Sequence, residues 1–222
     1  MTSPAIEVLY EDNHLLAANK PGGLLTQPSG TGRESLEERA KAYVRETRGK
    51  PGNVFLHAVH RLDKDASGVV LFARTSKALA RLAEELRERR ARKIYHAIVE
   101  TKPSRAHCTL YGYIRHSNHR AVAAAREEEG AKEAVLAYRL LGGASPGGFL
   151  LEIELETGRY HQIRAQLAGA GMPILGDRRY GSRRPFAPGA IALHHAAIEI
   201  AHPVTRATLR IEAPRPRFWA RF

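Results

Sequence analysis

The chain has 222 residues, enough for one large domain or for two lobes that share a core. Hydrophobic residues make up 43% of it, which excludes an intrinsically disordered chain, and no apolar run approaches the roughly 18 residues of a membrane span. Lysine and arginine number 35 against 23 acidic residues, giving a formal net charge of +12. This balance favours a polyanionic partner such as nucleic acid, although a solvated basic surface would produce it as well.

The beginning of the chain and its single cysteine indicate the compartment. Residues 1–13 include three acidic side chains and lack the basic-then-apolar order of a secretion signal. Cys108 has no second cysteine to pair with, which excludes a disulfide framework and a thiolate metal cluster. We expect a cytoplasmic protein, and a monomer as the default for a chain of this size.

The first half of the chain predicts short strands. Residues 6–10 and 15–19 are apolar stretches around a polar turn, which is typical of two strands. Residues 69–73 form a continuous apolar run between Gly68 and Arg74, which indicates a buried strand.

Three segments have helical patterns. Ser35 and Glu38 are spaced as a capping box and predict a helix that begins there. Residues 76–92 carry leucines and alanines at helical spacing opposite a charged face, which predicts a longer helix. Residues 161–167 predict a short helix that ends near Gly169.

Strands dominate the second half. Alternating or continuous apolar patterns predict strands at residues 94–100, 109–115, 135–141, 149–156, 191–200 and 208–212, and residues 126–132 read as a polar loop. Hairpins join several of the strands, so we expect an α+β fold with a mixed, mainly antiparallel sheet and flanking helices. No repeat and no long linker divides the chain, which favours a single domain over residues 1–222.

Several common catalytic motifs are absent. The chain has neither a G-x-x-x-x-G-K-S/T phosphate loop nor a G-x-S-x-G nucleophile elbow, and the glycines of residues 30–32 lack the strand-to-helix context of a dinucleotide site. Histidines pair at 57 and 60, at 116 and 119, and at 194 and 195, but no acidic or cysteine partner stands at a metal-binding spacing. Hydrogen-bonded histidines are therefore the favoured interpretation, and no metal is expected.

The first segment that suggests chemistry is a charged turn before a buried strand. His60, Arg61 and Asp63 precede Ser67 and Gly68, which lead into that strand. Catalytic groups are often found on loops beside the rigid end of a strand. Asp65 lies two residues beyond Asp63, so the pattern alone does not choose between the two carboxylates, and a plain turn or capping role is at least as common.

Two further segments are rich in hydrogen-bond donors and aromatic rings. Residues 157–164 (TGRYHQIR) place two arginines, a histidine, a glutamine and a tyrosine between a strand and a short helix, a set suited to phosphates and base edges. Residues 92–97 (RKIYHA) form a basic entry to a strand that contains Tyr95, which alone would be interpreted as a core or interface residue.

Together these segments resemble the RluA-type family of RNA pseudouridine synthases. The hallmark of that family, HRLD followed by two variable residues and TSG, stands here as HRLDKDASG at residues 60–68. Other matching motifs follow in the family's order and cover nearly the whole chain; they are NKPGGL at 19–24, KIYHA at 93–97, GRYHQIR at 158–164, PILGD at 173–177, YG at 180–181, LHH at 193–195, HP at 202–203 and AP at 213–214.

The resemblance implies roles for individual residues. It selects Asp63 over Asp65 as the catalytic aspartate, Tyr95 as the active-site tyrosine, and Arg164 as the arginine that pairs with the aspartate. Arg61 matches an arginine that can enter the space left by a flipped base. The resemblance also implies a sheet in two lobes with a central active-site cleft, and a catalytic domain without an N-terminal S4-type RNA-binding module.

The implied reaction converts specific uridines of structured ribosomal or transfer RNA to pseudouridine after base flipping. It needs no cofactor, because it involves neither a redox change nor a group taken from a second molecule. Further RNA contacts are expected from Lys20, His60, Arg61, Arg159, His161 and Gln162. Whether Asp63 attacks as a nucleophile or removes a ribose proton is left open.

Two positions depart from the family pattern. Ala66 and Tyr160 each replace a usual threonine, which removes a hydroxyl from the catalytic loop and enlarges a side chain near the expected cleft. An RNA-binding protein without catalytic activity is the alternative, and a nucleotide hydrolase has no supporting motif. The intact Asp63, Tyr95 and Arg164 favour the enzyme.

Overall fold

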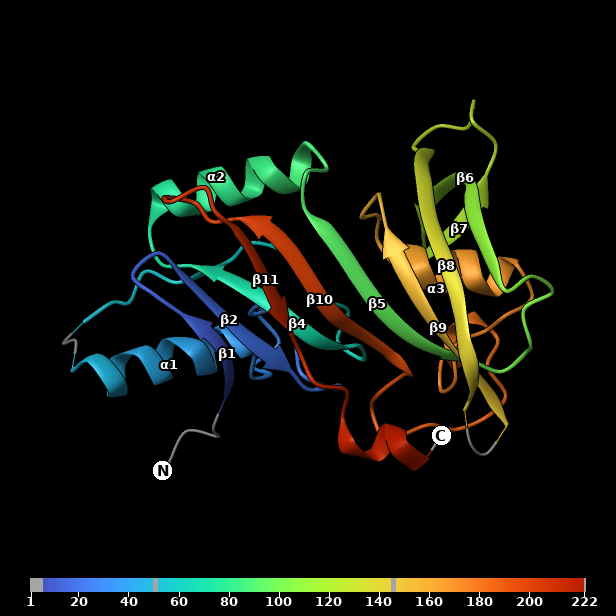
Figure 1. Cartoon of the computed structure of the whole chain (residues 1–222), viewed down its shortest axis with the longest axis horizontal. Coiled ribbons are helices and arrows are strands. Elements are labelled where there is room, and N and C mark those ends of the chain that lie inside the picture. Colours follow the sequence, from blue (N-terminus) through green and yellow to red (C-terminus); the bar gives the residue numbers. More distant parts are fainter. Residues whose placement is uncertain (1–5, 50–51, 145–146, 222) are drawn as a thin grey trace. The chain divides into compact units, whose positions relative to one another are not determined.

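The computed structural model describes residues 6–49, 52–144 and 147–221. The chain divides into two compact units, Met1–Ala91 with His195–Pro214 (unit 1), and Arg92–His194 with Arg215–Phe222 (unit 2). Each unit is built on antiparallel strands with few helices, which confirms the predicted α+β class (Figure 1). No helix in the described part of the chain is long and apolar enough to cross a membrane.

The strands of unit 1 form a sheet in the order β1-β2-β4-β10. Their bounds are β1 (Glu7–Glu11), β2 (Leu15–Lys20), β4 (Ser67–Ala73) and β10 (Leu193–Ala201), with β3 (His57–Ala58) along β4 and β11 (Thr208–Glu212) along β10. β2 and β4 are antiparallel, and their register sets Lys20 opposite Gly68. The last residue of β2 therefore lies beside the first residues of β4, where the segment containing Asp63 ends.

Two helices accompany this sheet. α1 (Leu36–Arg48) begins with the predicted capping box, in which the Ser35 hydroxyl accepts from the Glu38 amide and the Glu38 carboxylate accepts from the Ser35 amide. α2 (Ser76–Arg87) packs Ala78 and Leu82 into a core with alternate residues of β2 and β4. It ends five residues before the predicted end at Arg92, because Arg92 is already the first residue of β5.

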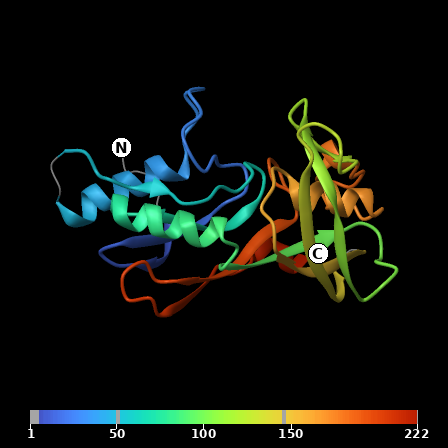
Figure 2. The same ribbon diagram turned by 90° about the horizontal axis from the view of Figure 1, so that it is seen from above.

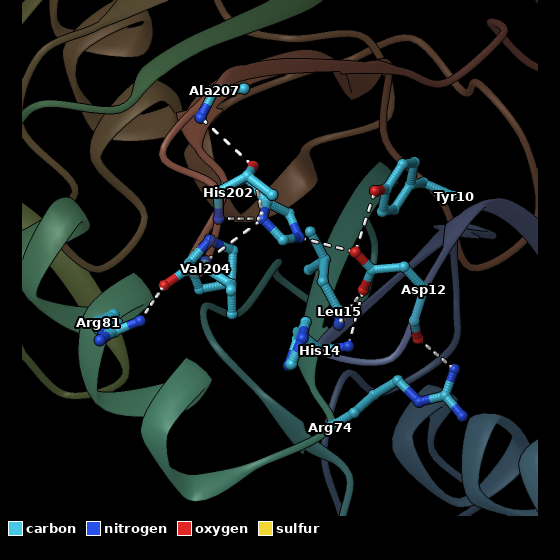
Figure 3. A network of polar contacts seen from close by, with 11 residues as sticks. Tyr10, Asp12, His14, Leu15, Arg74, Arg81, His202, Val204 and Ala207 are labelled. Carbon is cyan, nitrogen blue, oxygen red and sulfur yellow. Dashed lines mark hydrogen bonds and ion pairs between the residues drawn. The ribbon is translucent and has the colours of Figure 1, made fainter.

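A polar network in unit 1 joins the turn after β1 to the segment between β10 and β11 (Figure 3). One oxygen of Asp12 accepts the amides of His14 and Leu15, each at 2.8 Å, and the other lies 2.7 Å from Nε2 of His202. Nδ1 of His202 accepts the amides of Val204 and Thr205 at 3.3 and 3.0 Å, so the proton of the neutral ring is on Nε2 and is donated to Asp12.

The strands of unit 2 follow the order β5-β9-β8-β6-β7, and all of these pairs are antiparallel. They are β5 (Arg92–Val99), β6 (His107–Ser117), β7 (Arg120–Ala124), β8 (Lys132–Ala144) and β9 (Gly148–Leu155), accompanied by α3 (Gln162–Gly169) and the short 3-10 helices η1 (Arg178–Tyr180) and η2 (Arg217–Arg221). The polar loop predicted around residues 126–132 spans residues 125–131 and extends beyond the ends of β7 and β8 (Figures 1 and 2).

Candidate active site

Asp63 lies in unit 1, on the segment between β3 and β4. Side chains from an earlier part of the same chain hold this segment in place. The hydroxyl of Thr26 donates to the carbonyl of Leu62 at 2.9 Å and accepts the Leu62 amide at 3.1 Å. The amide of Ala66 closes a turn on the Asp63 carbonyl at 3.1 Å. The backbone is thus hydrogen-bonded on both sides of Asp63, while its side chain is half-buried.

Lys20 supplies the second support of this loop. Its Nζ is fully buried and donates to the carbonyl oxygens of Pro21, Leu24 and Lys64, at 3.0, 2.7 and 2.9 Å. Three acceptors match the three N–H groups of an ammonium ion. Burial lowers the pKa of Lys20 to about 7, and the negative charges of Asp63 and Asp65 oppose that shift. This places Lys20 under the loop and accounts for its donors, so an RNA contact is not the use that the structure suggests for it.

Gly68 is required where the loop enters β4. Its φ is +115°, and a Cβ atom there would lie 2.2 Å from the carbonyl oxygen of His195. Nδ1 of His195 lies 2.8 Å from the Val69 carbonyl, and its ring meets that of His60 edge-on at 5.4 Å. Nε2 of His60 accepts the Leu71 amide at 3.2 Å. His60 therefore fixes the start of the loop onto β4.

The charged side chains of the loop differ in exposure. Arg61 and Lys64 are exposed, whereas Asp63 and Asp65 are half-buried. Arg61 is accessible to a ligand, and its contact with RNA stays a prediction. Exposure does not separate Asp63 from Asp65. Ala66 is buried, and the contacts from Lys20 and Thr26 support the loop without the hydroxyl of the usual threonine.

Arg164 lies in unit 2 and is one half of a buried ion pair. Its Nε and Nη2 donate to the two carboxylate oxygens of Asp177, at 2.7 and 2.8 Å. Only 4% of the Arg164 side chain and 1% of the Asp177 side chain are exposed. This bidentate arrangement fixes the plane of the guanidinium group. Asp177 is the last residue of the PILGD motif, and the sequence alone predicted no role for it.

His161 extends this pair toward β7. Nη1 of Arg164 lies 3.0 Å from Nε2 of His161, and Nδ1 of His161 lies 3.0 Å from the hydroxyl of Tyr180, which also accepts the Ala121 amide at 2.7 Å. Burial, followed by the charges of Arg164 and Arg179, lowers the pKa of His161 to about 3. A neutral ring can accept from arginine at Nε2 and donate to Tyr180 at Nδ1.

Gln162 and Arg159 hold the turn before α3. The buried amide of Gln162 accepts from the Thr157 hydroxyl at 2.8 Å and from the Arg159 amide at 3.0 Å, and it donates to the Val135 carbonyl at 3.1 Å. Nε of Arg159 donates to the carbonyl of Glu133 at 2.9 Å. Direct RNA contacts remain a prediction for both residues, but the contacts described here position the turn.

Tyr95 lies on β5 with only 8% of its surface exposed, opposite Ile153 on β9. The sequence-predicted site residues thus fall on both units, with Asp63 in unit 1 and Tyr95 and Arg164 in unit 2. Among the residues that the structure describes, no three histidine, cysteine or acidic side chains gather where they could hold a metal ion.

The similarity of this chain to known proteins extends over residues of both units. A family model described as RNA pseudouridylate synthase matches residues 14–169, which include Asp63, Tyr95 and Arg164. The chain is 34% identical over 231 residues to tRNA pseudouridine synthase C of Salmonella typhimurium, covering 96% of the chain and 87% of that protein. It is also 34% identical over 229 residues to ribosomal large subunit pseudouridine synthase D of Xylella fastidiosa, covering 95% of the chain and 66% of that protein.

A solved structure has a similar fold. The structure of Human RNA Pseudouridylate Synthase Domain Containing 4 matches with a TM-score of 0.79 and 25% sequence identity, covering 97% of this chain and 90% of the human one.

Proposed function

The chain belongs to the RluA-type family of RNA pseudouridine synthases, enzymes that isomerise uridine in RNA, and from this we propose that Asp63 is its catalytic residue. The observation that carries the proposal is the support of the loop around Asp63. Lys20 and Thr26 bind the loop backbone at Lys64 and Leu62, one residue to either side of Asp63. Such an arrangement orients a carboxylate that has to meet a substrate in one geometry.

The reaction can be balanced with the residues of the chain alone. The bond between C1′ of the ribose and N1 of the uracil breaks, the uracil turns, and C1′ bonds to C5. C5 loses its proton and N1 gains one, so that the product has the same composition as the substrate. An ionised carboxylate can attack as a nucleophile or remove a ribose proton, and Asp63 serves in either case. Since no atom from a second molecule enters the product, we expect turnover without a metal ion or a nucleotide.

We propose that Arg164 supplies the positive charge that the Asp63 carboxylate needs when a base covers it. A carboxylate that loses water favours its neutral form unless a cation compensates. The guanidinium group of Arg164 is already oriented by Asp177, so little side-chain entropy would be lost in holding its positive charge in place. Asp177 would then act through Arg164.

We propose that Tyr95 stacks on the uracil and that Arg61 enters the space that the flipped base leaves. Extracting a base from a stacked helix costs a few kcal/mol, which contacts made only in the flipped state must offset. Arg61 is exposed and adjoins the supported loop, so its side chain can move toward the RNA while Asp63 stays in place.

The test of this function uses Asp63→Asn and the matched variant Asp65→Asn, two half-buried carboxylates of one loop. Chemical mapping of pseudouridine, together with tritium release from C5-labelled uridine in RNA, should show activity reduced at least roughly 10³-fold for Asp63→Asn and largely retained for Asp65→Asn. Equal pseudouridine from wild type and Asp63→Asn would refute the catalytic role, and RNA binding without any turnover by the wild type would favour the RNA-binding alternative.

We propose that the substrate is a structured transfer or ribosomal RNA. The relatives are named for transfer RNA and for the large ribosomal subunit, respectively. Pseudouridine maps of total RNA from cells with and without the gene should differ at one or a few positions in one of these classes. Those positions then identify the substrate of the purified protein.

A further inference from the structure

Tyr160 presents an exposed aromatic ring directly before α3. Its ring stacks on that of His161, with the centroids 3.8 Å apart and the planes inclined by 17°. The residue is nevertheless 45% exposed. A large aromatic side chain with one face supported and much of its surface in solvent is suited to stacking on a further flat group.

The turn between β6 and β7 borders this ring and is held in place. Asn118 and His119 both have positive φ, at 44° and 58°, which is the geometry of a tight two-residue hairpin. The carbonyl of His119 accepts two hydrogen bonds, from the hydroxyl of Tyr160 at 3.3 Å and from Nη1 of Arg179 at 2.8 Å. The ring of His116 meets that of Tyr160 edge-on at 5.0 Å. Figure 1 shows α3 beside β6 and β7 in unit 2.

The surroundings of the ring are basic. Arg120 and Arg179 are exposed, and the charge of Arg179 acts on His161, the residue on which Tyr160 stacks. A guanidinium group has five N–H donors, and the bond to His119 uses one from Arg179. Arg120 lies over the ring of Tyr180, at 5.1 Å from its centroid. We call the five residues Tyr160, His116, His119, Arg120 and Arg179 the Tyr160 surface.

The Tyr160 surface is connected to the proposed catalytic arginine within the same unit. His161, which supports Tyr160, contacts Arg164 through Nε2, and Arg164 lies 5.0 Å from the centroid of the Tyr180 ring. A nucleotide held on Tyr160 would therefore be positioned relative to Arg164 through one intervening side chain.

We propose that the Tyr160 surface is a binding subsite for an unpaired nucleotide of the RNA substrate, whose base stacks on Tyr160 and whose phosphates contact Arg120 and Arg179. Base stacking supplies affinity without demanding a particular base, and arginine neutralises the neighbouring phosphates. The inference rests on the proposed function, since it names a part of the RNA that this enzyme would bind in addition to the modified uridine.

The test separates stacking from charge. Binding of a single-stranded oligouridylate is compared with binding of an oligomer of the same length that has ribose and phosphate but no bases. The wild type should bind the oligouridylate more tightly, and the base stacked on Tyr160 should contribute roughly 5-fold to 150-fold of this ratio. Tyr160→Ala should lower the ratio by that factor and leave the affinity for the base-free oligomer unchanged. Tyr160→Phe should keep the ratio, because Arg179 still holds the His119 carbonyl.

Tyr111→Ala is the matched control. Tyr111 is 62% exposed and lies on β6, where an odd-numbered residue projects from the face opposite that of His116. Tyr111→Ala should leave the ratio of the two oligomer affinities unchanged. Tyr160→Thr provides a second variant should Tyr160→Ala fold poorly.

The outcomes distinguish the two levels of proposal. An equal ratio in wild type, Tyr160→Ala and Tyr160→Thr would overturn the subsite, and so would an equal loss in Tyr111→Ala. Because binding of these oligomers requires no turnover, a wild type that forms no pseudouridine refutes the proposed function and leaves the binding result valid. With the mapped RNA, Tyr160→Ala should raise KM and largely retain kcat.

Discussion

At the scale of single residues, the candidate site depends on buried charges that are matched atom by atom. Lys20 meets three carbonyl oxygens, and Arg164 meets both oxygens of Asp177. The family resemblance located Lys20 and Arg164 but attributed an RNA contact to the first and nothing to Asp177. A sequence pattern shows that a charge is present, whereas its partners depend on segments that only the folded chain brings together.

The Arg164–Asp177 pair allows a direct prediction of stability. Asp177→Asn leaves the guanidinium charge buried with one carboxylate fewer, so the free energy of unfolding should fall by about 3–5 kcal/mol. Urea unfolding measures this change. The matched control is Glu154→Gln, because Glu154 forms a similar two-bond pair with Arg92 on the surface of the same unit, at 2.9 Å for each bond.

That control should change the free energy of unfolding by less than about 1 kcal/mol, since solvent screens an exposed pair. If Asp177→Asn and Glu154→Gln lowered the free energy of unfolding by the same amount, burial would not govern the contribution of the Arg164–Asp177 pair to stability.

At the scale of helices and strands, patterns of apolar residues predicted most of the elements. The capping box at Ser35, the buried strand β4 and the hairpin of β8 and β9 are confirmed. β3 and β7 were missed, because a two-residue strand has no periodicity and β7 depends on the tight turn before it. The predicted end of α2 at Arg92 was wrong, because α2 ends at Arg87 and Arg92 already begins β5.

The network around Asp12 predicts a pH dependence of this scaffold. Burial would raise the pKa of Asp12, but hydrogen bonds from the amides of His14 and Leu15 and from His202 outweigh it and lower the pKa below its usual value. A group with a lowered pKa stabilises the folded state above its unfolded pKa, near 3.9, and loses that contribution as the pH falls through the folded value. Asp12→Asn should therefore reduce the free energy of unfolding by about 1–3 kcal/mol at pH 7.

The difference between wild type and Asp12→Asn should shrink as the pH falls below about 4. Urea unfolding of both proteins from pH 7 to pH 3 measures it. A difference that stays constant over this range would mean that the carboxylate charge of Asp12 contributes nothing to the network. Activity is not the readout, because the network lies outside the proposed catalytic residues.

At the scale of the whole molecule, sequence reasoning predicted the family, the α+β class and the lobed organisation, and the chain does form two compact units. The single catalytic domain and the active-site cleft stay predictions. Asp63 was identified because long ordered motifs surround it, whereas Asp65, two residues away, has the same charge and a similar exposure. The resemblance, not the physical chemistry of the loop, made that choice.

The net charge of +12 leads to the last prediction, which concerns RNA affinity. Each phosphate that a lysine or arginine neutralises releases counterions, so the logarithm of the binding constant falls by roughly 0.7 for each contact and each unit of log salt on single-stranded RNA. If four phosphates are neutralised, raising the KCl concentration fourfold should weaken binding roughly 50-fold. Titrations with Asp63→Asn measure this without turnover. Arg120→Gln and Arg179→Gln should each remove one phosphate contact, which lowers the steepness of log binding constant against log salt by roughly 0.7. Tyr160→Ala should weaken binding at every salt concentration and leave that slope unchanged. An affinity that does not change with salt would mean that the basic surplus keeps the protein dissolved and plays no part in holding RNA.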